Sequence, residues 1–204
     1  MNKIKLIAAL AVIALIFLVV TRESKDNLSY IELKRDATIL AFGDSITYGY
    51  GVPQSFSYPS QLQKKTGLRV INAGVSGEES SDGLLRLPPL LKEKPALVIL
   101  CHGGNDIIRK RSDEKLKSNL IEMINLIKAS GAKVLLVGVP NFGMLGFKTH
   151  SLYEEVAGET EVFFEEDVLS MVEADNRLKI DAIHPNEKGY KIMVEAFIKH
   201  LKFI

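Results

Sequence analysis

The sequence predicts an α/β fold in which helices cover both faces of a mainly parallel central sheet. Short segments that are apolar throughout alternate with longer segments in which apolar residues recur at helical spacing. Strands without a polar face are typical of parallel sheets, because helices pack on both sides of such a sheet. The chain of 204 residues is 47% hydrophobic and 25% charged, which is enough for one domain with a sizeable core.

The predicted strands are apolar segments that end at glycine or at polar residues. We expect them at residues 38–42, 69–72, 97–101, 134–139 and 161–164.

Four helices are expected between and after these strands. The first covers residues 57–66. The second has a leucine face over residues 84–91, but its two consecutive prolines should kink or restart it. The third is capped by Ser112 or Asp113 and ends at Gly131. A closing amphipathic helix has its apolar face at Tyr190, Met193, Val194, Phe197 and Leu201.

Charge and cysteine content exclude several classes of protein. The 26 basic side chains balance 25 acidic ones, so bulk charge gives no reason to expect a polyanionic partner such as nucleic acid. The single cysteine, Cys101, excludes an intramolecular disulfide, and no Cys/His cluster has zinc-site spacing. Stability must therefore come from packing.

The chain opens on an apolar run from Leu6 to Val20, with Lys3 and Lys5 before it and a polar stretch after it. A positive start before an apolar run is typical of export signals, with the lysines held on the cytoplasmic side. The run is at the border between a signal-peptide core of about 7–15 residues and a full span of about 20. No Ala-x-Ala cleavage site follows it, which favours an uncleaved anchor.

We therefore expect residues 1–22 to be a signal-anchor helix or a cleaved signal peptide. Residues 23–34 would be a polar linker, and residues 35–204 the folded domain. That domain would be exported to the periplasmic side of the cytoplasmic membrane if anchored, or into the periplasm if the segment is cleaved.

Three polar, glycine-marked segments follow the first three strands, and a fourth precedes the closing helix. They are Gly43-Asp44-Ser45, Gly74-Val75-Ser76-Gly77, Gly103-Gly104-Asn105-Asp106 and Asp181-Ala182-Ile183-His184-Pro185. Each alone could be a turn or a helix cap. In a parallel sheet, however, such segments meet at the carboxyl ends of the strands, where ligands bind. Together they supply a serine, a histidine to take its proton, a carboxylate to orient the imidazole, and N–H groups for an oxyanion.

These four segments resemble the sequence blocks of the SGNH (GDSL) hydrolases. The likeness covers about residues 36–202 in the family's order and spacing, and is greatest to the branch of bacterial thioesterase I, lysophospholipase L1 and arylesterase. It implies a three-layer α/β/α, flavodoxin-like fold and no metal or organic cofactor. It also implies a serine esterase that hydrolyses small-molecule or lipid acyl esters through an acyl-enzyme intermediate. Separately, we expect a monomer with no nucleic-acid partner.

The resemblance also implies roles for five residues. Ser45 would be the nucleophile, His184 the general base, and Asp181 the carboxylate that orients the imidazole. The Ser45 N–H, the Gly77 N–H and the Asn105 side chain would form the oxyanion hole.

Other residues leave alternatives open. Glu78-Glu79 departs from the branch, which often has Asp and a small hydroxyl residue there. His102 is a rival base, although a histidine at a strand end more often bonds locally, and Cys101 is interpreted as a small buried apolar residue. Two further groups are expected on the surface. They are His150 and His200, and the acidic residues Glu154, Glu155, Glu165, Glu166 and Asp167.

Three alternative functions are weighed against the serine esterase. The runner-up substrate class is a carbohydrate O-acetyl ester of the cell envelope. A metal-dependent phosphoesterase would use Asp44, Asn105, Asp106 and His184 as ligands, but would leave Ser45 idle. A non-catalytic envelope binding protein would not need the complete set of serine, histidine, aspartate and asparagine.

An apolar, glycine-interrupted segment at residues 140–147 follows the fourth strand. It should lie at the catalytic edge of the sheet, where adaptable apolar side chains could line an acyl pocket. These side chains are Phe142, Met144, Leu145 and Phe147. The alternative is a loop that packs on the core.

Overall fold

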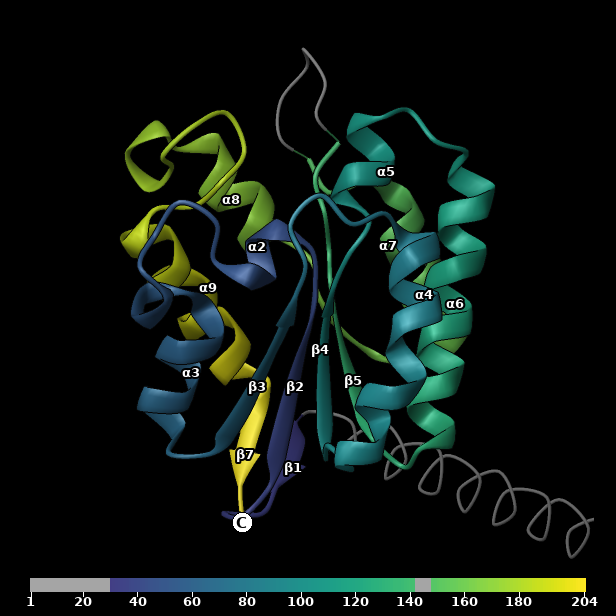
Figure 1. Cartoon of the computed structure of the whole chain (residues 1–204), viewed down its shortest axis with the longest axis vertical. Helices are drawn as coiled ribbons and strands as arrows, with labels where there is room; N and C mark the ends of the chain where they lie inside the picture. The colour runs from purple at the N-terminus through teal and green to yellow at the C-terminus, as the bar shows by residue number, and fades with distance from the viewer. Residues whose placement is uncertain (1–29, 142–147) are drawn as a thin grey trace, which may run out of the picture. The chain divides into compact units, whose positions relative to one another are not determined.

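The structure is a computed structural model that describes residues 30–141 and 148–204 (Figure 1). The chain divides into two compact units, residues 1–31 and 32–204, and the second contains the main sheet. Five strands, all paired in parallel, lie in the order β3-β2-β4-β5-β6, so the predicted α/β class is confirmed. The strands are β2 (Thr38–Gly43), β3 (Arg69–Gly74), β4 (Leu97–Cys101), β5 (Lys133–Val137) and β6 (Phe163–Glu165).

Helices cover both faces of this sheet and complete three layers (Figure 1). One face carries α3 (Tyr58–Thr66), α8 (Val168–Ala174) and α9 (Glu187–Lys199). The other carries α4 (Ser80–Leu90), α6 (Asp113–Ala129) and α7 (Ser151–Thr160). Every residue of β4 is buried, as expected for a central strand with helices on each side.

The central strands end in register, and this positions the functional loops. Gly43 at the end of β2 pairs with Gly74 of β3 and with Cys101 of β4. The approach is so close that a Cβ on Gly43 would overlap the Cys101 carbonyl oxygen, which is why glycine is needed there. Figure 1 shows α2 (Ser45–Tyr48) and α5 (Gly104–Ile108), which follow β2 and β4, at the same end of the sheet.

The helix α4 differs from its sequence prediction. It runs through Pro88 and Pro89 as one helix, so the expected restart is wrong, and a 3₁₀ turn, η2 (Leu91–Glu93), follows it. Pro89 has no N–H for the Leu85 carbonyl, but Leu85 lies on the solvent side, 79% exposed, so water can take that bond. Leu85 therefore does not belong to the buried leucine face.

The chain ends also differ from the prediction. The closing helix α9 stops at Lys199, and Leu201 belongs instead to β7 (Leu201–Phe203). This strand pairs with β1 (Ile31–Leu33), and the Ile204 N–H donates to the Leu33 carbonyl at 3.0 Å. β1 lies within residues 23–34, so regular structure begins inside the segment that the sequence assigned to a polar linker.

Two predicted features lie outside the described residues. They are the apolar run at residues 6–20, and the segment 142–147 with the predicted acyl-pocket residues Phe142, Met144, Leu145 and Phe147. Across residues 30–141 and 148–204, no helix combines the length and hydrophobicity that a membrane span requires. The N-terminal anchor or signal peptide and the acyl pocket therefore stay predictions.

Candidate active site

The structure brings the predicted nucleophile, base and orienting carboxylate into one hydrogen-bonded chain. The Nε2 atom of His184 lies 2.9 Å from the Oγ atom of Ser45. The Nδ1 atom of the same imidazole lies 2.8 Å from Oδ2 of Asp181. In this geometry the imidazole can take the serine proton while the carboxylate stabilises the imidazolium that forms.

Ser45 is placed by a tight turn at the end of β2. It is the first residue of α2, and Asp44 caps that helix because its Oδ1 atom accepts the Ile46 N–H at 3.1 Å. Asp44 is buried, which raises the pKa of its carboxyl. The Thr47 hydroxyl lies 3.0 Å from the Tyr58 hydroxyl and ties α2 to α3. These contacts hold the half-buried Ser45 at the mouth of the site.

The loop before α9 orients the histidine. The Oδ1 atom of Asp181 accepts the backbone N–H groups of Ile183 and His184, each at 2.8 Å. Burial raises the pKa of Asp181, but these bonds and the imidazole outweigh it and hold the pKa below its ordinary value. The Tyr50 ring packs on the imidazole, with the ring centroids 4.5 Å apart. No sequence pattern indicated Tyr50.

The three predicted oxyanion donors come from three loops at the same end of the sheet. In the described part of the chain, neither the Ser45 N–H nor the Gly77 N–H donates to a protein acceptor. Gly77 has a φ of 80°, a left-handed conformation that favours glycine. The Asn105 Nδ2 donates to the Glu78 carbonyl at 3.0 Å and lies 3.5 Å from Oδ2 of Asp44. Two backbone donors are thus available to a ligand, while protein acceptors hold the Asn105 amide.

His102, the rival base, is fully buried and bonded locally. Its Nδ1 atom accepts the Gly103 N–H at 2.9 Å, so its Nε2 atom carries the proton and donates to Glu78 Oε2 at 3.1 Å. Cys101 is also buried, and burial raises the pKa of its thiol well above the ordinary value. Neither residue is placed to act on a substrate at Ser45.

The four candidate metal ligands do not form a metal site. Both carboxylate oxygens of Asp106 are turned toward Ser80, where they accept its N–H at 2.8 Å and its hydroxyl at 2.6 Å. Asp44 caps α2, and His184 is bonded to Ser45 and Asp181. Among the described residues, no group of three or more His, Cys, Asp or Glu side chains could hold a metal ion.

The histidines and acidic residues that the sequence placed on the surface have structural partners or face solvent. His150 and His200 are half-buried rather than fully exposed, because they pair with Asp113 at 3.3 Å and with Glu165 at 2.8 Å. Glu165 is half-buried for the same reason. The other acidic residues of the predicted surface cluster are exposed, namely Glu154, Glu155, Glu166 and Asp167.

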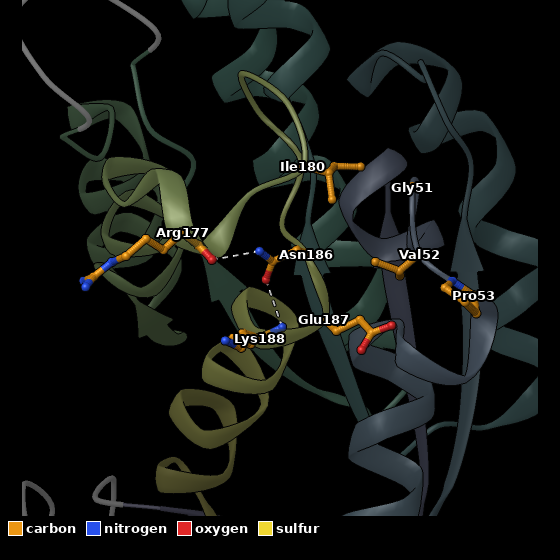
Figure 2. Close-up of a pocket in the computed structure, with 8 residues that line it drawn as sticks. All are labelled: Gly51, Val52, Pro53, Arg177, Ile180, Asn186, Glu187 and Lys188. Atoms are coloured by element: carbon orange, nitrogen blue, oxygen red, sulfur yellow. Dashed lines mark hydrogen bonds between the residues drawn. The ribbon is translucent and has the colours of Figure 1, made fainter.

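A cavity of about 370 Å³ adjoins the histidine loop (Figure 2). One side is formed by residues 51–53, which directly follow Tyr50, and the other by Ile180 and Asn186, which flank the Asp181–His184 segment. Glu187, Lys188 and Arg177 of the turn η3 (Asn176–Leu178) also line it, but the Arg177 guanidinium is paired with Asp175 and points away from the other lining residues (Figure 2). Sequence analysis did not predict this cavity, because its two sides are far apart in the chain.

The three-layer fold and the serine–histidine–aspartate chain define a serine hydrolase. Comparison with known proteins agrees: the sequence model of the GDSL-like Lipase/Acylhydrolase family matches residues 41–192. "Esterase TesA" of Pseudomonas aeruginosa is 39% identical over an alignment of 162 residues that covers 72% of this chain and 79% of that protein. An "Arylesterase" of Vibrio mimicus is 33% identical over 80% of this chain and 89% of that protein.

Solved structures give the same result. The psychrotrophic esterase EstA from Pseudoalteromonas sp. superimposes with a TM-score of 0.72 at 27% identity, over 81% of this chain and 96% of that one. A crystal structure of TesA gives 0.69 at 34% identity, over 78% and 94%. This chain belongs to the GDSL-like lipase/acylhydrolase family. It is a serine esterase, a hydrolase of carboxylic esters.

Proposed function

We propose that Ser45, His184 and Asp181 carry out ester hydrolysis in two steps. The Ser45 hydroxyl attacks the ester carbonyl as His184 Nε2 takes its proton, and a tetrahedral oxyanion forms. The oxyanion collapses to an acyl-Ser45 ester as His184 returns the proton to the leaving alcohol or thiol. In the second step, His184 Nε2 takes a proton from a water molecule as the water attacks the acyl carbonyl. The carboxylic acid then leaves, and His184 returns the proton to Ser45. The observation that carries this proposal is the continuous chain of contacts at 2.9 and 2.8 Å.

The oxyanion would be held by the Ser45 N–H, the Gly77 N–H and the Asn105 amide. Support comes from the two backbone donors, which have no acceptor among the described residues. The Asn105 amide contact to Asp44 is long, 3.5 Å, so that hydrogen can turn to a stronger negative acceptor when the oxyanion forms.

The substrate class is proposed to be small-molecule or lipid acyl esters and thioesters. One relative, 32% identical over 81% of this chain and 83% of its own length, is named "Thioesterase 1/protease 1/lysophospholipase L1" in Escherichia coli. The cavity beside the histidine loop supports a substrate with an apolar group, because Val52, Pro53 and Ile180 line it. Turnover of esters and thioesters that share one leaving group and differ in acyl-chain length would test this preference.

The location is proposed from the sequence of the N-terminus. Lys3 and Lys5 before the apolar run would direct the catalytic domain across the cytoplasmic membrane, with the run as its anchor. Such a position suits an esterase of lipid or envelope esters.

The direct test is Ser45→Ala together with labelling by a serine-directed phosphonate. We expect the variant to fold, because it loses one hydroxyl at the mouth of the site, and to lose both turnover and labelling. The Pseudoalteromonas esterase was solved inhibited by monoethylphosphonate, which makes this reagent class suitable. Mass spectrometry should find the phosphonate of the wild-type protein on Ser45. Turnover by Ser45→Ala at the wild-type rate would contradict the assignment.

A further inference from the structure

The exposed loop that carries Gly77 is held by a charged side chain that enters the protein. The loop, residues 75–79, joins β3 to α4, and Gly77 at its tip is exposed. Glu78 follows Gly77 directly, yet its side chain is only 6% exposed. Burying a carboxylate at this place is costly unless it is paired, so its partners define what the burial does.

Arg86 of α4 is the first partner of Glu78. Its Nε atom donates to Glu78 Oε1 at 2.8 Å, and its Nη2 atom donates to Glu78 Oε2 at 2.6 Å, a two-point contact with fixed geometry. Nη2 also donates to the Ala73 carbonyl in β3 at 3.0 Å. The guanidinium lies over the Phe42 ring, 4.4 Å from its centroid. Arg86 thus ties the loop to the sheet and to α4 at once.

His102 is the second partner. Because its Nδ1 atom accepts the Gly103 N–H, its Nε2–H is directed at Glu78 Oε2. The imidazole fits only because α4 has glycine at position 83, where a Cβ would overlap the ring. Burial raises the pKa of Glu78, but His102 and Arg86 outweigh it and bring the pKa to about 2. The carboxylate is therefore ionised and accepts three hydrogen bonds.

The backbone of Glu78 connects this cluster to the catalytic edge. Its carbonyl accepts the Asn105 amide at 3.0 Å, and its N–H donates to Val75 at 3.2 Å across the turn. Two of the three proposed oxyanion donors, Gly77 and Asn105, therefore adjoin or contact one residue, Glu78, while Arg109 holds the outer side of the loop through the Gly77 carbonyl at 3.1 Å. Displacing a catalytic group by about 1 Å can cost about 10²-fold in rate.

We propose that Glu78, Arg86 and His102 form a buried cluster that positions the oxyanion-binding loop. The three residues do not touch the substrate; they act through Gly77 and Asn105. This inference rests on the proposed function, since it needs those two groups to bind the oxyanion. It gives Glu78, the first residue of the Glu78-Glu79 departure, and the buried His102 one joint explanation.

The first test is Glu78→Gln in the full chain, measured on a short-chain ester. An amide offers one acceptor and two donors where the carboxylate accepted three bonds, so the loop should shift. We expect kcat to fall about 10- to 100-fold with KM within about threefold, because only transition-state contacts are lost. Glu78→Asp, which keeps the charge, should restore part of kcat. Titration with the phosphonate gives the concentration of active sites in each sample. The rate divided by that concentration is the kcat of the folded, active protein.

Glu165→Gln is the matched control, because Glu165 also pairs with a histidine, in this case the half-buried His200, at 2.8 Å. It lies on β6, at the edge of the sheet opposite β3. This variant should lower the melting temperature and leave kcat at the wild-type value. An equal loss of kcat in Glu165→Gln and Glu78→Gln would mean general destabilisation and would overturn the positioning role.

Two variants of His102 distinguish the contribution of its Nε2 atom from that of its Nδ1 atom. Glutamine places an amide nitrogen near the Nε2 position and can still donate to Glu78, whereas asparagine reaches only as far as Nδ1. We expect His102→Gln to keep most of kcat and His102→Asn to resemble Glu78→Gln. Equal kcat values for the two variants would remove His102 from the cluster's action.

A double variant with Asn105→Ala tests whether Glu78 acts through Asn105. If it does, Glu78→Gln should cost less in the Asn105→Ala background than in the wild type, because only its effect through Gly77 is left. Full additivity, or wild-type kcat in Glu78→Gln despite a lowered melting temperature, would overturn the proposal. Failure of the proposed function is visible separately: if Ser45→Ala or Asn105→Ala keeps wild-type kcat, that assignment fails first, and the positioning role fails with it.

Discussion

Asp181 accepts three hydrogen bonds within one short loop, and this fixes both its charge and the histidine tautomer. In Asp181→Asn the amide oxygen can keep the two backbone bonds, so the loop should stay folded. The amide nitrogen would then face Nδ1 and favour the tautomer with a proton on Nε2, which cannot accept from Ser45. We expect kcat to fall on the order of 10⁴-fold. The check is kcat and melting temperature on one ester; a loss below tenfold would make Asp181 a turn residue only.

Asn105 is the residue for which a catalytic and a structural role make opposite predictions. As an oxyanion donor, its replacement by alanine should lower kcat about 10²–10³-fold with little change in KM. As a purely structural amide on the Glu78 carbonyl, it should cost about 0.5–1.5 kcal/mol of stability and little activity. Measuring kcat, KM and melting temperature together separates the two. Slow phosphonate labelling should persist in Asn105→Ala, because Ser45 and His184 are intact.

The sequence could predict that Ser45, His184 and Asp181 belong to one site because the motifs that contain them, ambiguous singly, together resemble the blocks of one hydrolase family. It could not predict the pairing of Glu78 with His102, which are 24 residues apart, on a loop and at a strand end. Local patterns carry no information on such contacts, so the sequence alone leaves His102 as an alternative base. The structure excludes that role because Gly103 and Glu78 bind its two ring nitrogens. Tyr50 was missed for the same reason.

Among the elements, α8 carries an unusual buried group. Glu173 is fully buried on this helix, and neither carboxylate oxygen has a hydrogen-bond partner among the described residues. Burial, with smaller contributions from Asp44 and Asp181, raises the pKa of Glu173 from the ordinary 4.5 to about 9. The group is therefore protonated in the folded protein at neutral pH, whereas it ionises in the unfolded chain.

The expected consequence is a pH-dependent cost of stability. Below about pH 4.5, Glu173 is protonated in both the folded and the unfolded protein, and the cost vanishes. Between pH 4.5 and about 9, only the unfolded chain releases this proton. The free energy of unfolding therefore falls by about 1.4 kcal/mol per pH unit over that range. Glu173→Gln removes this proton equilibrium. Urea unfolding should find the variant more stable than the wild type at pH 8, with the advantage shrinking toward pH 5. An advantage equal at both pH values would contradict the raised pKa.

Elements with a distinct apolar pattern were predictable. The apolar strands and the amphipathic α6 overlap the predicted ranges, although β5 begins and ends earlier than predicted and β6 is shifted toward the C-terminus. Sequence analysis did not predict α7 or α8, of 10 and 7 residues, because neither has the proline start and glycine stop that mark α3, a helix of similar length. The predicted end of α9 was too far along the chain because Leu201 continues the apolar spacing of the helix. Leu201 is buried, but it lies in the strand β7.

At the scale of the whole molecule, the order of the strands explains how short motifs that are far apart in the sequence form one site. The loops after β2, β3 and β4 supply Ser45, Gly77 and Asn105, and these strands are direct neighbours in the sheet. The histidine loop comes from the far end of the sequence and reaches the same edge ahead of α9. The apolar strands predict a parallel sheet. In a parallel sheet the segments that follow the strands meet at one edge, so the sequence also predicts that these motifs lie together.

The last prediction concerns the N-terminus. If the apolar run at residues 6–20 anchors the protein, the full-length chain should fractionate with membranes and resist high salt, because burial in hydrocarbon is not screened by ions. Detergent should release it. A matched chain beginning at Ser29 keeps β1, whose Ile31 is buried, and should be soluble with unchanged kcat. N-terminal sequencing decides the alternative: a mature chain that starts after residue 20 and is found free in the periplasm would replace the anchor with a cleaved signal peptide.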